Sequence, residues 1–342
     1  MANATVIGID LAKSVIQLHG SDASGRCVFA KKMQRKKVLP FLAKQPPCVV
    51  GMEACGGSHY WAREIKSLGH DVKLMPPQYV KPYVKTHKTD AADAEAICEA
   101  VIRPNMRFVP IKSVEQQAVL LVHRERDGLM KERTSIINRL RAVFSEFGIT
   151  IPAGAKKLHV WLRDEYPEQE KLPVLVDRQI QRIYKKIDLI EQEVKDLDRE
   201  IDLYNKEDKR CKRLLEVPGI GRLAASAMVA SVGSAKEFRS GRQFAAWLGL
   251  VPNQHSSGGK QNLLGISKRG DVYIRRMLIH GARAVVRHRT ENNAQYLWIE
   301  SLMTRRPTNV VVVALANKLA RIAWALLNKE EKYRKEVIPK VA

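Results

Sequence analysis

The chain has 342 residues, a length that accommodates two or three domains, and 45% of them are apolar, enough for a buried core in each. Lysine and arginine number 59 against 36 acidic residues, so the formal net charge is +23. This excess predicts a polyanionic partner, most simply nucleic acid. An anionic membrane is the rival, but we find no apolar run of spanning length and no charged signal-peptide start, which argues against a membrane protein.

Five cysteines are scattered without a Cys-x-x-Cys pair: Cys27, Cys48, Cys55, Cys98 and Cys211. This pattern indicates reduced thiols in a cytosol and disfavours disulfides or a zinc site.

The first 110 residues alternate between short apolar runs and helical stretches. Three close strands, expected to form an antiparallel meander, are followed by helix, strand, helix, strand and helix. The predicted strands span 4–10, 15–19, 27–31, 47–53 and 70–74, and the predicted helices span 36–44 and 60–68 and begin again at about 90.

Acidic residues occupy particular places in this pattern. Asp10 ends the first strand and Glu53 ends the fourth, while Asp90 and Asp93 lie in the last helix, which Thr89 can cap. Their i, i+3 spacing puts these aspartates about 5–6 Å apart at Cβ on one helix face. All four acids are therefore expected at one edge of the sheet, where divalent cations about 3.5–4 Å apart would offset their repulsion and clamp a phosphoryl displacement. The alternative is that they are ordinary strand ends and acids that favour a helix N-terminus.

The middle segment, 111–210, contains two long helical patterns. A stretch from about 113 to 147 carries many arginines, and we favour contact with a nucleic-acid backbone over a merely solvated basic face. A heptad pattern follows, which we call the seam: Val176, Ile180, Ile183, Ile187, Ile190, Val194, Leu197, Ile201 and Tyr204. Either an antiparallel hairpin with the preceding helix or an intermolecular coiled coil would bury it.

The last segment, 211–335, combines a tight turn with a cationic region. The turn around Gly219 and Gly221 resembles a helix-hairpin-helix turn, whose exposed N–H groups hold phosphates. Between Asn253 and Arg289 the sole acid is Asp271, whereas the predicted nucleic-acid contacts there are Lys260, Lys268, Arg269, Arg275 and Arg276. This region also contains Ser256-Ser257-Gly258-Gly259, which by itself is typical of a flexible linker. The apolar helix at 309–327 is expected in the core.

The strand order and the acids resemble the ribonuclease-H-like fold of RuvC-type nucleases. The motifs Gly8-Ile-Asp10-Leu-Ala-Lys13, Glu53-Ala-Cys-Gly56 and Lys88-Thr-Asp90-Ala-Ala-Asp93-Ala resemble, more narrowly, the DEDD transposases of bacterial insertion sequences, relatives of the Piv and MooV DNA invertases. The block from Pro218 to Arg276 resembles their transposase-20 domain. That domain carries a nucleophilic serine directly before a glycine, a position that Ser257 fits and for which Ser256 competes.

The resemblance implies a fold of three parts: an α/β ribonuclease-H-like (RuvC-like) domain at 1–110, a helical coiled-coil dimerisation segment at 111–210, and a mainly α domain at 211–335. It implies that Asp10, Glu53, Asp90 and Asp93 bind Mg²⁺, with Mn²⁺ also suited to oxygen ligands. Ser257 would then form a covalent phosphoserine link to DNA.

The implied activity is that of a recombinase moving its own insertion sequence between donor and target DNA, guided by a structured bridge RNA. Such chemistry needs paired subunits, which favours self-association as a dimer or tetramer, and the place of action is the bacterial cytoplasm, at the nucleoid. The alternative within enzymes is a metal-dependent Holliday-junction nuclease of RuvC type without covalent chemistry. An inactive nucleic-acid-binding regulator is the alternative of another class.

Overall fold

The structure is a computed structural model that describes residues 3–85, 89–166, 172–288 and 294–333. Contacts divide the chain into two compact units, Met1–Val114 and Glu115–Ala342, here named the N-terminal and the C-terminal unit. Each is described by itself. The predicted middle and last segments share the C-terminal unit, while Lys88 of the third motif lies outside the described residues.

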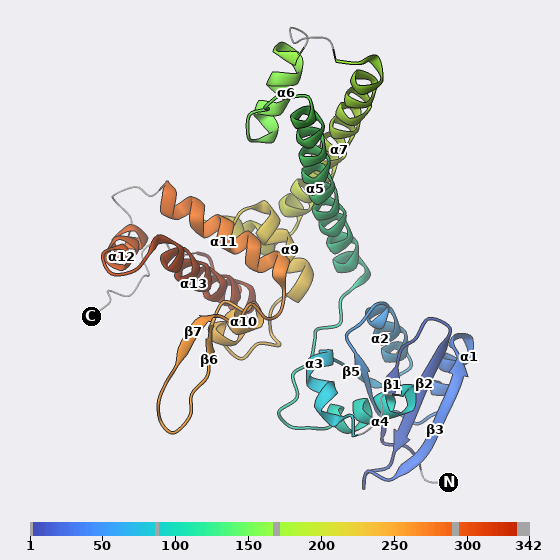
Figure 1. The fold of residues 1–342 in the computed structure, drawn as a ribbon. Coiled ribbons are helices and arrows are strands. Elements are labelled where there is room, and N and C mark those ends of the chain that lie inside the picture. The colour runs from blue at the N-terminus through green and yellow to red at the C-terminus, as the bar shows by residue number, and fades with distance from the viewer. Residues whose placement is uncertain (1–2, 86–88, 167–171, 289–293, 334–342) are drawn as a thin grey trace. The chain divides into compact units, whose positions relative to one another are not determined.

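The N-terminal unit is built on a five-stranded sheet with the spatial order β3-β2-β1-β4-β5 (Figure 1). Strands β1, β2 and β3 form an antiparallel meander, whereas β4 runs parallel to both β1 and β5. This confirms the predicted antiparallel meander of the first three strands. Their bounds are Val6–Asp10 (β1), Val15–Ser21 (β2), Cys27–Gln34 (β3), Val49–Glu53 (β4) and Asp71–Met75 (β5).

Helices cover both faces of this sheet. Ile7 and Ile9 face one core, which α1 (Arg35–Leu42) and α2 (Ser58–Ser67) close. Val6, from the alternate row of β1, faces a second core beneath α4 (Asp90–Val101). The short helices α3 (Pro77–Val80) and η1 (Lys81–Tyr83) lead toward α4. This mixed sheet with helices on both faces fits an α/β ribonuclease-H-like domain.

The C-terminal unit begins with two long helices, α5 (Val114–Glu146) and α7 (Val174–Glu207), with α6 (Ala155–Asp164) packed beside them. Ion pairs join Arg126 to Asp198 at 2.6 Å and Arg133 to Glu191 at 3.1 Å. The later residue on α5 pairs with the earlier residue on α7, so the two helices are antiparallel.

The seam is buried within the chain. Ile180, Ile187, Ile190 and Val194 pack with residues of α5 and α6 in one hydrophobic cluster. The packing matches the antiparallel hairpin within the chain, one of the two alternatives, while pairing of this segment between chains stays a prediction. Arg126 and Arg133 of α5 form ion pairs with α7. These two arginines are therefore engaged within the chain and do not support the nucleic-acid contact that we favoured for α5.

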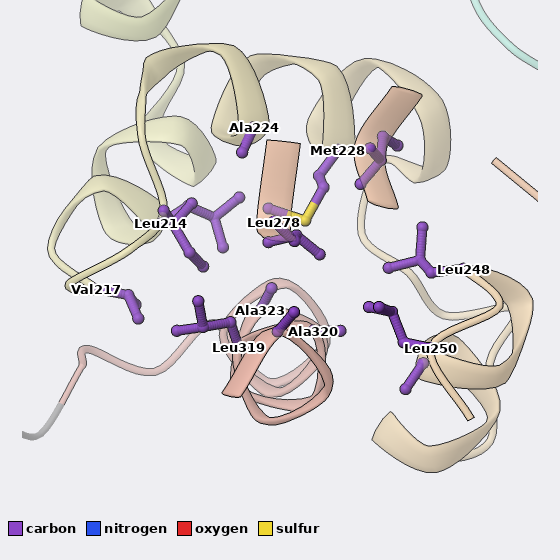
Figure 2. Packing of buried hydrophobic residues seen from close by; sticks show 14 of the residues in the cluster. Leu214, Val217, Ala224, Met228, Leu248, Leu250, Leu278, Leu319, Ala320 and Ala323 are labelled. Atoms are coloured by element: carbon purple, nitrogen blue, oxygen red, sulfur yellow. The ribbon is translucent and has the colours of Figure 1, made fainter. Parts of the chain in front are cut away.

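The rest of the C-terminal unit packs around α13, whose residues Leu319, Ala320 and Ala323 lie in the main core (Figure 2). By length and composition α13 resembles a membrane-spanning helix, so the expectation that no apolar run reaches that length is wrong for it. Core packing accounts for much of its apolar character. The elements are α8 (Lys209–Leu215), α9 (Arg222–Val232), α10 (Gly241–Trp247), β6 (Pro252–Gln254), β7 (Leu263–Ile266), α11 (Val272–Arg287), α12 (Ala294–Met303) and α13 (Thr308–Lys329).

Candidate active site

Strands β1 and β4 carry the same arrangement of residues. In each strand a valine, a glycine and an acid follow one another at two-residue spacing: Val6, Gly8 and Asp10 in β1, and Val49, Gly51 and Glu53 in β4. The parallel register pairs valine with valine and glycine with glycine. Residues two apart point to the same face of a sheet, so Asp10 and Glu53 continue two adjacent rows on one face.

Helix α4 lies directly on these rows because the glycines leave room for it. A Cβ atom at Gly8 would lie 2.2 Å from the Ala94 carbonyl oxygen, and one at Gly51 would lie 2.9 Å from Cβ of Val101. Both distances are too short for real contacts, so any larger residue would push the helix away. The sheet face that carries Asp10 and Glu53 is therefore the face that α4 covers.

The direction of α4 puts its acids at the same end of the sheet. Cys98 Sγ lies 3.7 Å from the Val6 carbonyl oxygen, while Ala94 is above Gly8. The helix thus runs antiparallel to β1. From Ala94 back to Asp90 is about 6 Å of helix, and from Gly8 forward to Asp10 is about 6.6 Å of strand. The first turn of α4 therefore reaches the level of Asp10.

The N-terminus of α4 is capped as predicted, since the Thr89 hydroxyl accepts a hydrogen bond from the Ala92 N–H at 3.2 Å. Asp90 is exposed and Asp93 is half-buried in the first turn, where the helix dipole stabilises negative charge. We call Asp10, Glu53, Asp90 and Asp93 the acid corner.

A cysteine also lies beside the acid corner. Burial and then the negative charges of Glu53 and Asp10 raise the pKa of the Cys55 thiol. Cys55 belongs to the motif Glu53-Ala-Cys-Gly56 and follows Glu53 by two residues.

The predicted nucleophile lies at the tip of a β-hairpin, which extends from the helices of its unit (Figure 1). The Lys260 N–H donates to the Ser257 carbonyl oxygen at 3.0 Å, and Gly258 and Gly259 between them have φ of +56° and +76°. Positive φ at both central residues is the mark of a type I′ turn, which favours two glycines. The Ser-Ser-Gly-Gly sequence is thus a defined hairpin turn, and its interpretation as a linker is wrong. We call β6, β7 and the loop between them the serine hairpin.

The hairpin distinguishes its two serines. Ser256 Oγ accepts hydrogen bonds from Gln254 Nε2 at 2.8 Å and from the Asn262 N–H at 3.3 Å. Ser257 is exposed, and its hydroxyl forms no hydrogen bond within the described ranges. Ser256 therefore stabilises the hairpin, while the Ser257 hydroxyl remains accessible to a substrate.

The foot of the hairpin is held by Arg275, which is 7% exposed. Its guanidinium donates to the carbonyl oxygens of Leu248 at 2.8 Å and Arg269 at 2.9 Å. This corrects the prediction that Arg275 contacts nucleic acid, because its charge is buried in backbone hydrogen bonds. Arg276, also predicted as a contact, is half-exposed, pairs with Asp127 and lies over the ring of Tyr273 at 5.3 Å.

The other predicted cations of this region, Lys260, Lys268 and Arg269, are exposed. Asp271, the acid that interrupts this cationic stretch, caps α11 by accepting from the Ile274 N–H at 2.9 Å. Its carboxylate is therefore engaged with the helix N-terminus beside them.

Comparison with known proteins places the chain in a family. Residues 7–149 match the profile of the DEDD transposases of IS110 type, and residues 211–297 match the profile described as "Transposase IS116/IS110/IS902 family". A "Probable family 20 transposase" of Pseudomonas aeruginosa is 50% identical over 335 residues, which cover 97% of this chain and 99% of the relative. The chain belongs to the IS116/IS110/IS902 family of transposases. The resemblance seen in the sequence is confirmed.

Further relatives of this transposase carry the same kind of name. The "Transposase for insertion sequence element IS1328" of Yersinia enterocolitica is 42% identical over 95% of this chain and 97% of its own length. The "Transposase for insertion sequence element IS1111A" of Coxiella burnetii is 41% identical over 98% of this chain and 92% of its own length. The protein is thus a DNA transposase, an enzyme that acts on DNA.

The family suggests dependence on a divalent metal, and the acid corner has the matching chemistry. Its four carboxylates offer hard oxygen ligands, and three of them are half-buried at the edge of a sheet. Within the described ranges, no three His, Cys, Asp or Glu side chains lie close enough together to hold a metal ion. The backbone thus brings the four acids to one face and one end of the sheet, while their side chains do not form a closed ligand set.

The turn at Gly219 and Gly221 joins α8 to α9. Gly219 has φ of +95°, and a Cβ atom at Gly281 would lie 1.8 Å from its carbonyl oxygen, so this turn packs tightly against α11. Gly221, by contrast, is exposed at the start of α9. The helix-hairpin-helix role of this turn stays a prediction.

Proposed function

We propose that this transposase cuts and rejoins DNA strands with a divalent metal held by the acid corner and with Ser257 as a covalent nucleophile. The observation that supports the metal site best is the common placement of Asp10, Glu53 and the first turn of α4 on one sheet face. Four carboxylates gathered there repel one another unless cations bind between them. Closing the ligand set requires side-chain movement, which a bound ion would favour.

Mg²⁺, or Mn²⁺ in its place, would polarise the scissile phosphate and stabilise the leaving oxygen. Asp10 and Glu53 would hold the ion from adjacent strand ends about 4.8 Å apart. Asp90 and Asp93 would approach from the helix. Because α4 packs on glycines, the distance between these two sets of ligands is fixed by backbone contacts and not by flexible side chains.

The serine step exchanges one phosphate ester bond for another. Ser257 Oγ forms a bond to phosphorus while the bond from phosphorus to the departing DNA oxygen breaks, and the serine proton is passed to that oxygen. Attack by an oxygen of the second DNA strand reverses the step and releases the serine, so no external energy source is needed. Lys260, directly opposite Ser257 in the turn, supplies positive charge beside the hydroxyl.

Self-association and RNA guidance complete the proposal. The acid corner and Ser257 belong to different compact units, so we expect one copy of the protein to supply the carboxylates and another to supply the serine. A bridge RNA would pair with donor and target DNA in the bacterial cytoplasm. The net charge of +23 and the exposed Lys260, Lys268 and Arg269 support contact with such polyanions.

Denaturing electrophoresis tests the covalent step. The protein is incubated with branched junction DNA, the RNA of its element and Mg²⁺, and a protein band shifted by attached DNA is sought. Ser257→Ala should abolish this band, whereas Ser256→Ala, the matched control, should retain it. Strand cleavage that persists in Ser257→Ala would instead support a junction nuclease of RuvC type.

Mixing tests the division of labour between copies. Asp10→Ala and Ser257→Ala proteins are each expected to be inactive alone and to recover part of the covalent product when combined. No recovery from mixed, co-assembled proteins would mean that each copy uses its own serine.

A further inference from the structure

A groove of about 1740 Å³ lies in the C-terminal unit beside the serine hairpin. It is lined by one side of α13, by β7, by the start of α10 and by Trp298 of α12. Nothing in the proposed chemistry uses it. We call it the cationic groove.

Helix α13 has a second apolar side that the core does not cover. Leu319, Ala320 and Ala323 face the core (Figure 2), whereas Val310, Val313 and Ala314 line the groove. The exposed fraction is 51% for Val310, and it is 58% and 49% for Leu263 and Leu264 on the opposite wall. On this side of α13 the apolar residues lie between polar and charged ones, including Asn317, Lys318 and Arg321, so a partner that covers it must satisfy both.

The charge of the groove indicates what kind of partner this is. Its lining contains one acid, Glu331, among five cations: Arg242, Arg306, Lys318, Arg321 and Lys332. Lys318 is half-buried, and its Nζ lies 4.4 Å from the centre of the Trp298 ring. Burial and then the neighbouring Arg321 lower the pKa of Lys318. Neither cation forms an ion pair within the described ranges, so both would gain from an anionic ligand.

We propose that the cationic groove binds unpaired nucleotides of the nucleic acid on which the transposase acts. Phosphates would lie along the cations, and bases would pack against Trp298, Leu263 and Leu264, as in sites that bind single strands by stacking and charge. Paired bases are stacked inside a duplex and would leave the apolar walls uncovered. The exposed apolar walls therefore favour single strands.

Other occupants fit the charge less well. A second copy of this chain also carries a net charge of +23, so its surface would place like charges together. Residues 334–342 contain three cations and one acid and offer no net negative charge.

The groove lies close to the proposed site of cleavage, and this step rests on the proposed function. Strand β7 lines the groove and leads back to the turn that presents Ser257. The four steps along the chain from Lys260 to Leu264 span about 13 Å when extended, the length of about four stacked nucleotides. The groove would thus hold bases a few positions from the scissile phosphate.

Fluorescence anisotropy tests this proposal with the full chain carrying Ser257→Ala, without Mg²⁺, so that cleavage plays no part. The probes are a labelled strand of twelve thymidines and a labelled duplex of twelve base pairs. Adding Lys318→Ala and Arg321→Ala should weaken single-strand binding about tenfold and lower its logarithmic salt slope by about 1.4. Duplex binding should change much less. The matched control is Lys185→Ala with Lys186→Ala, two exposed lysines of α7.

A second variant, Val313→Asp, adds an acid to the apolar wall and should also weaken single-strand binding. Melting temperatures near that of the parent would show that the variants fold. Equal losses in the groove and control variants would overturn the proposal, as would unchanged binding together with an altered oligomeric mass, which would mark an interface between copies. Because Ser257 is already removed, failure of the covalent mechanism would not change these results.

Discussion

The acid corner and the serine hairpin are built in opposite ways. At the acid corner two strands and a helix meet through direct backbone contacts. A Cβ atom at Gly8 would lie 2.2 Å from the Ala94 carbonyl oxygen, a distance that no side chain tolerates. The serine hairpin is an exposed arm fixed at its foot by Arg275 and shaped at its tip by a turn of two glycines. In the proposed mechanism the metal ligands need fixed distances, whereas a nucleophile that makes and breaks a bond with DNA needs access. The packing of each region matches the role proposed for it.

The largest effect is expected at the rigid site. Asp10→Ala should slow strand cleavage by about a thousandfold, equivalent to about 4 kcal/mol of activation free energy, because a metal supplies several kcal/mol of charge stabilisation. Binding of junction DNA in a gel-shift assay should be retained. Asp71→Ala, which removes an exposed acid of the same unit, is the control. Loss of binding in Asp10→Ala would point to a structural role for this residue.

The second effect concerns the stability of the helices that carry the serine hairpin's unit and depends on pH. His123 is 2% exposed and joins α5 to α9 and α11, since its Nε2–H donates to Ser226 Oγ at 3.0 Å and its Nδ1 accepts from the Tyr273 hydroxyl at 3.1 Å. Burial and then the charge of Arg126 lower the pKa of His123 from 6.5 to about 4.

The unfolded chain therefore takes up this proton first as the pH falls. The contribution of neutral His123 to the free energy of unfolding should be fully present above pH 6.5 and should decrease by about 3 kcal/mol toward pH 4. Thermal unfolding between pH 7 and pH 4 measures this loss, and His123→Gln should reduce the slope. An unchanged slope in that variant, while the exposed His255→Gln behaves like wild type, would show that other groups govern the acid sensitivity.

The third effect breaks the close packing that distinguishes the acid corner. Gly8→Ala should destabilise the N-terminal unit by about 2 kcal/mol, because the added methyl group overlaps the Ala94 carbonyl and displaces α4. Cleavage should fall as well, since Asp90 and Asp93 move with the helix. Gly56→Ala is the control, with no atom within 4 Å of its new Cβ. Equal melting temperatures for the two variants would refute the packing argument.

The smallest effect concerns the tip of the hairpin. Gly258→Val places a β-branched residue at φ of +56° and should destabilise the turn by about 1–2 kcal/mol. We expect less covalent product and an unchanged melting temperature, because the arm lies outside the core. Gly258→Asn, which tolerates this conformation, should restore the product. Failure of Asn to do so would mean that the space at Gly258 matters more than its backbone conformation.

The two regions also differed in how much the sequence revealed. Buried runs that end in an acid were enough to predict the strands along the chain and to place Asp10 and Glu53 at strand ends, because both signals are local. The close approach of α4 to Gly8 and Gly51 was not predictable, since it depends on contacts about 90 and 50 residues away in the chain, as the helix bounds show.

At the serine hairpin local composition was misleading. Ser-Ser-Gly-Gly is typical of linkers, and the pairing of Ser257 with Lys260 that makes it a turn depends on the flanking strands. Arg275 and Arg276 are adjacent in sequence, yet one is buried and the other half-exposed, and tertiary packing alone separates them. The partner of the seam was likewise undetermined, because a heptad pattern is the same for helices of one chain or two.

The central claim is that Asp10, Glu53 and the start of α4 meet around one divalent site. Fe²⁺-mediated hydroxyl-radical cleavage of the polypeptide tests it most directly, since bound Fe²⁺ cuts the backbone near its ligands. We predict cuts near residues 10, 53 and 90 together, suppressed by excess Mg²⁺ and absent in Asp10→Asn. Cuts confined to one of these segments, or cuts that persist in Asp10→Asn, would contradict the account.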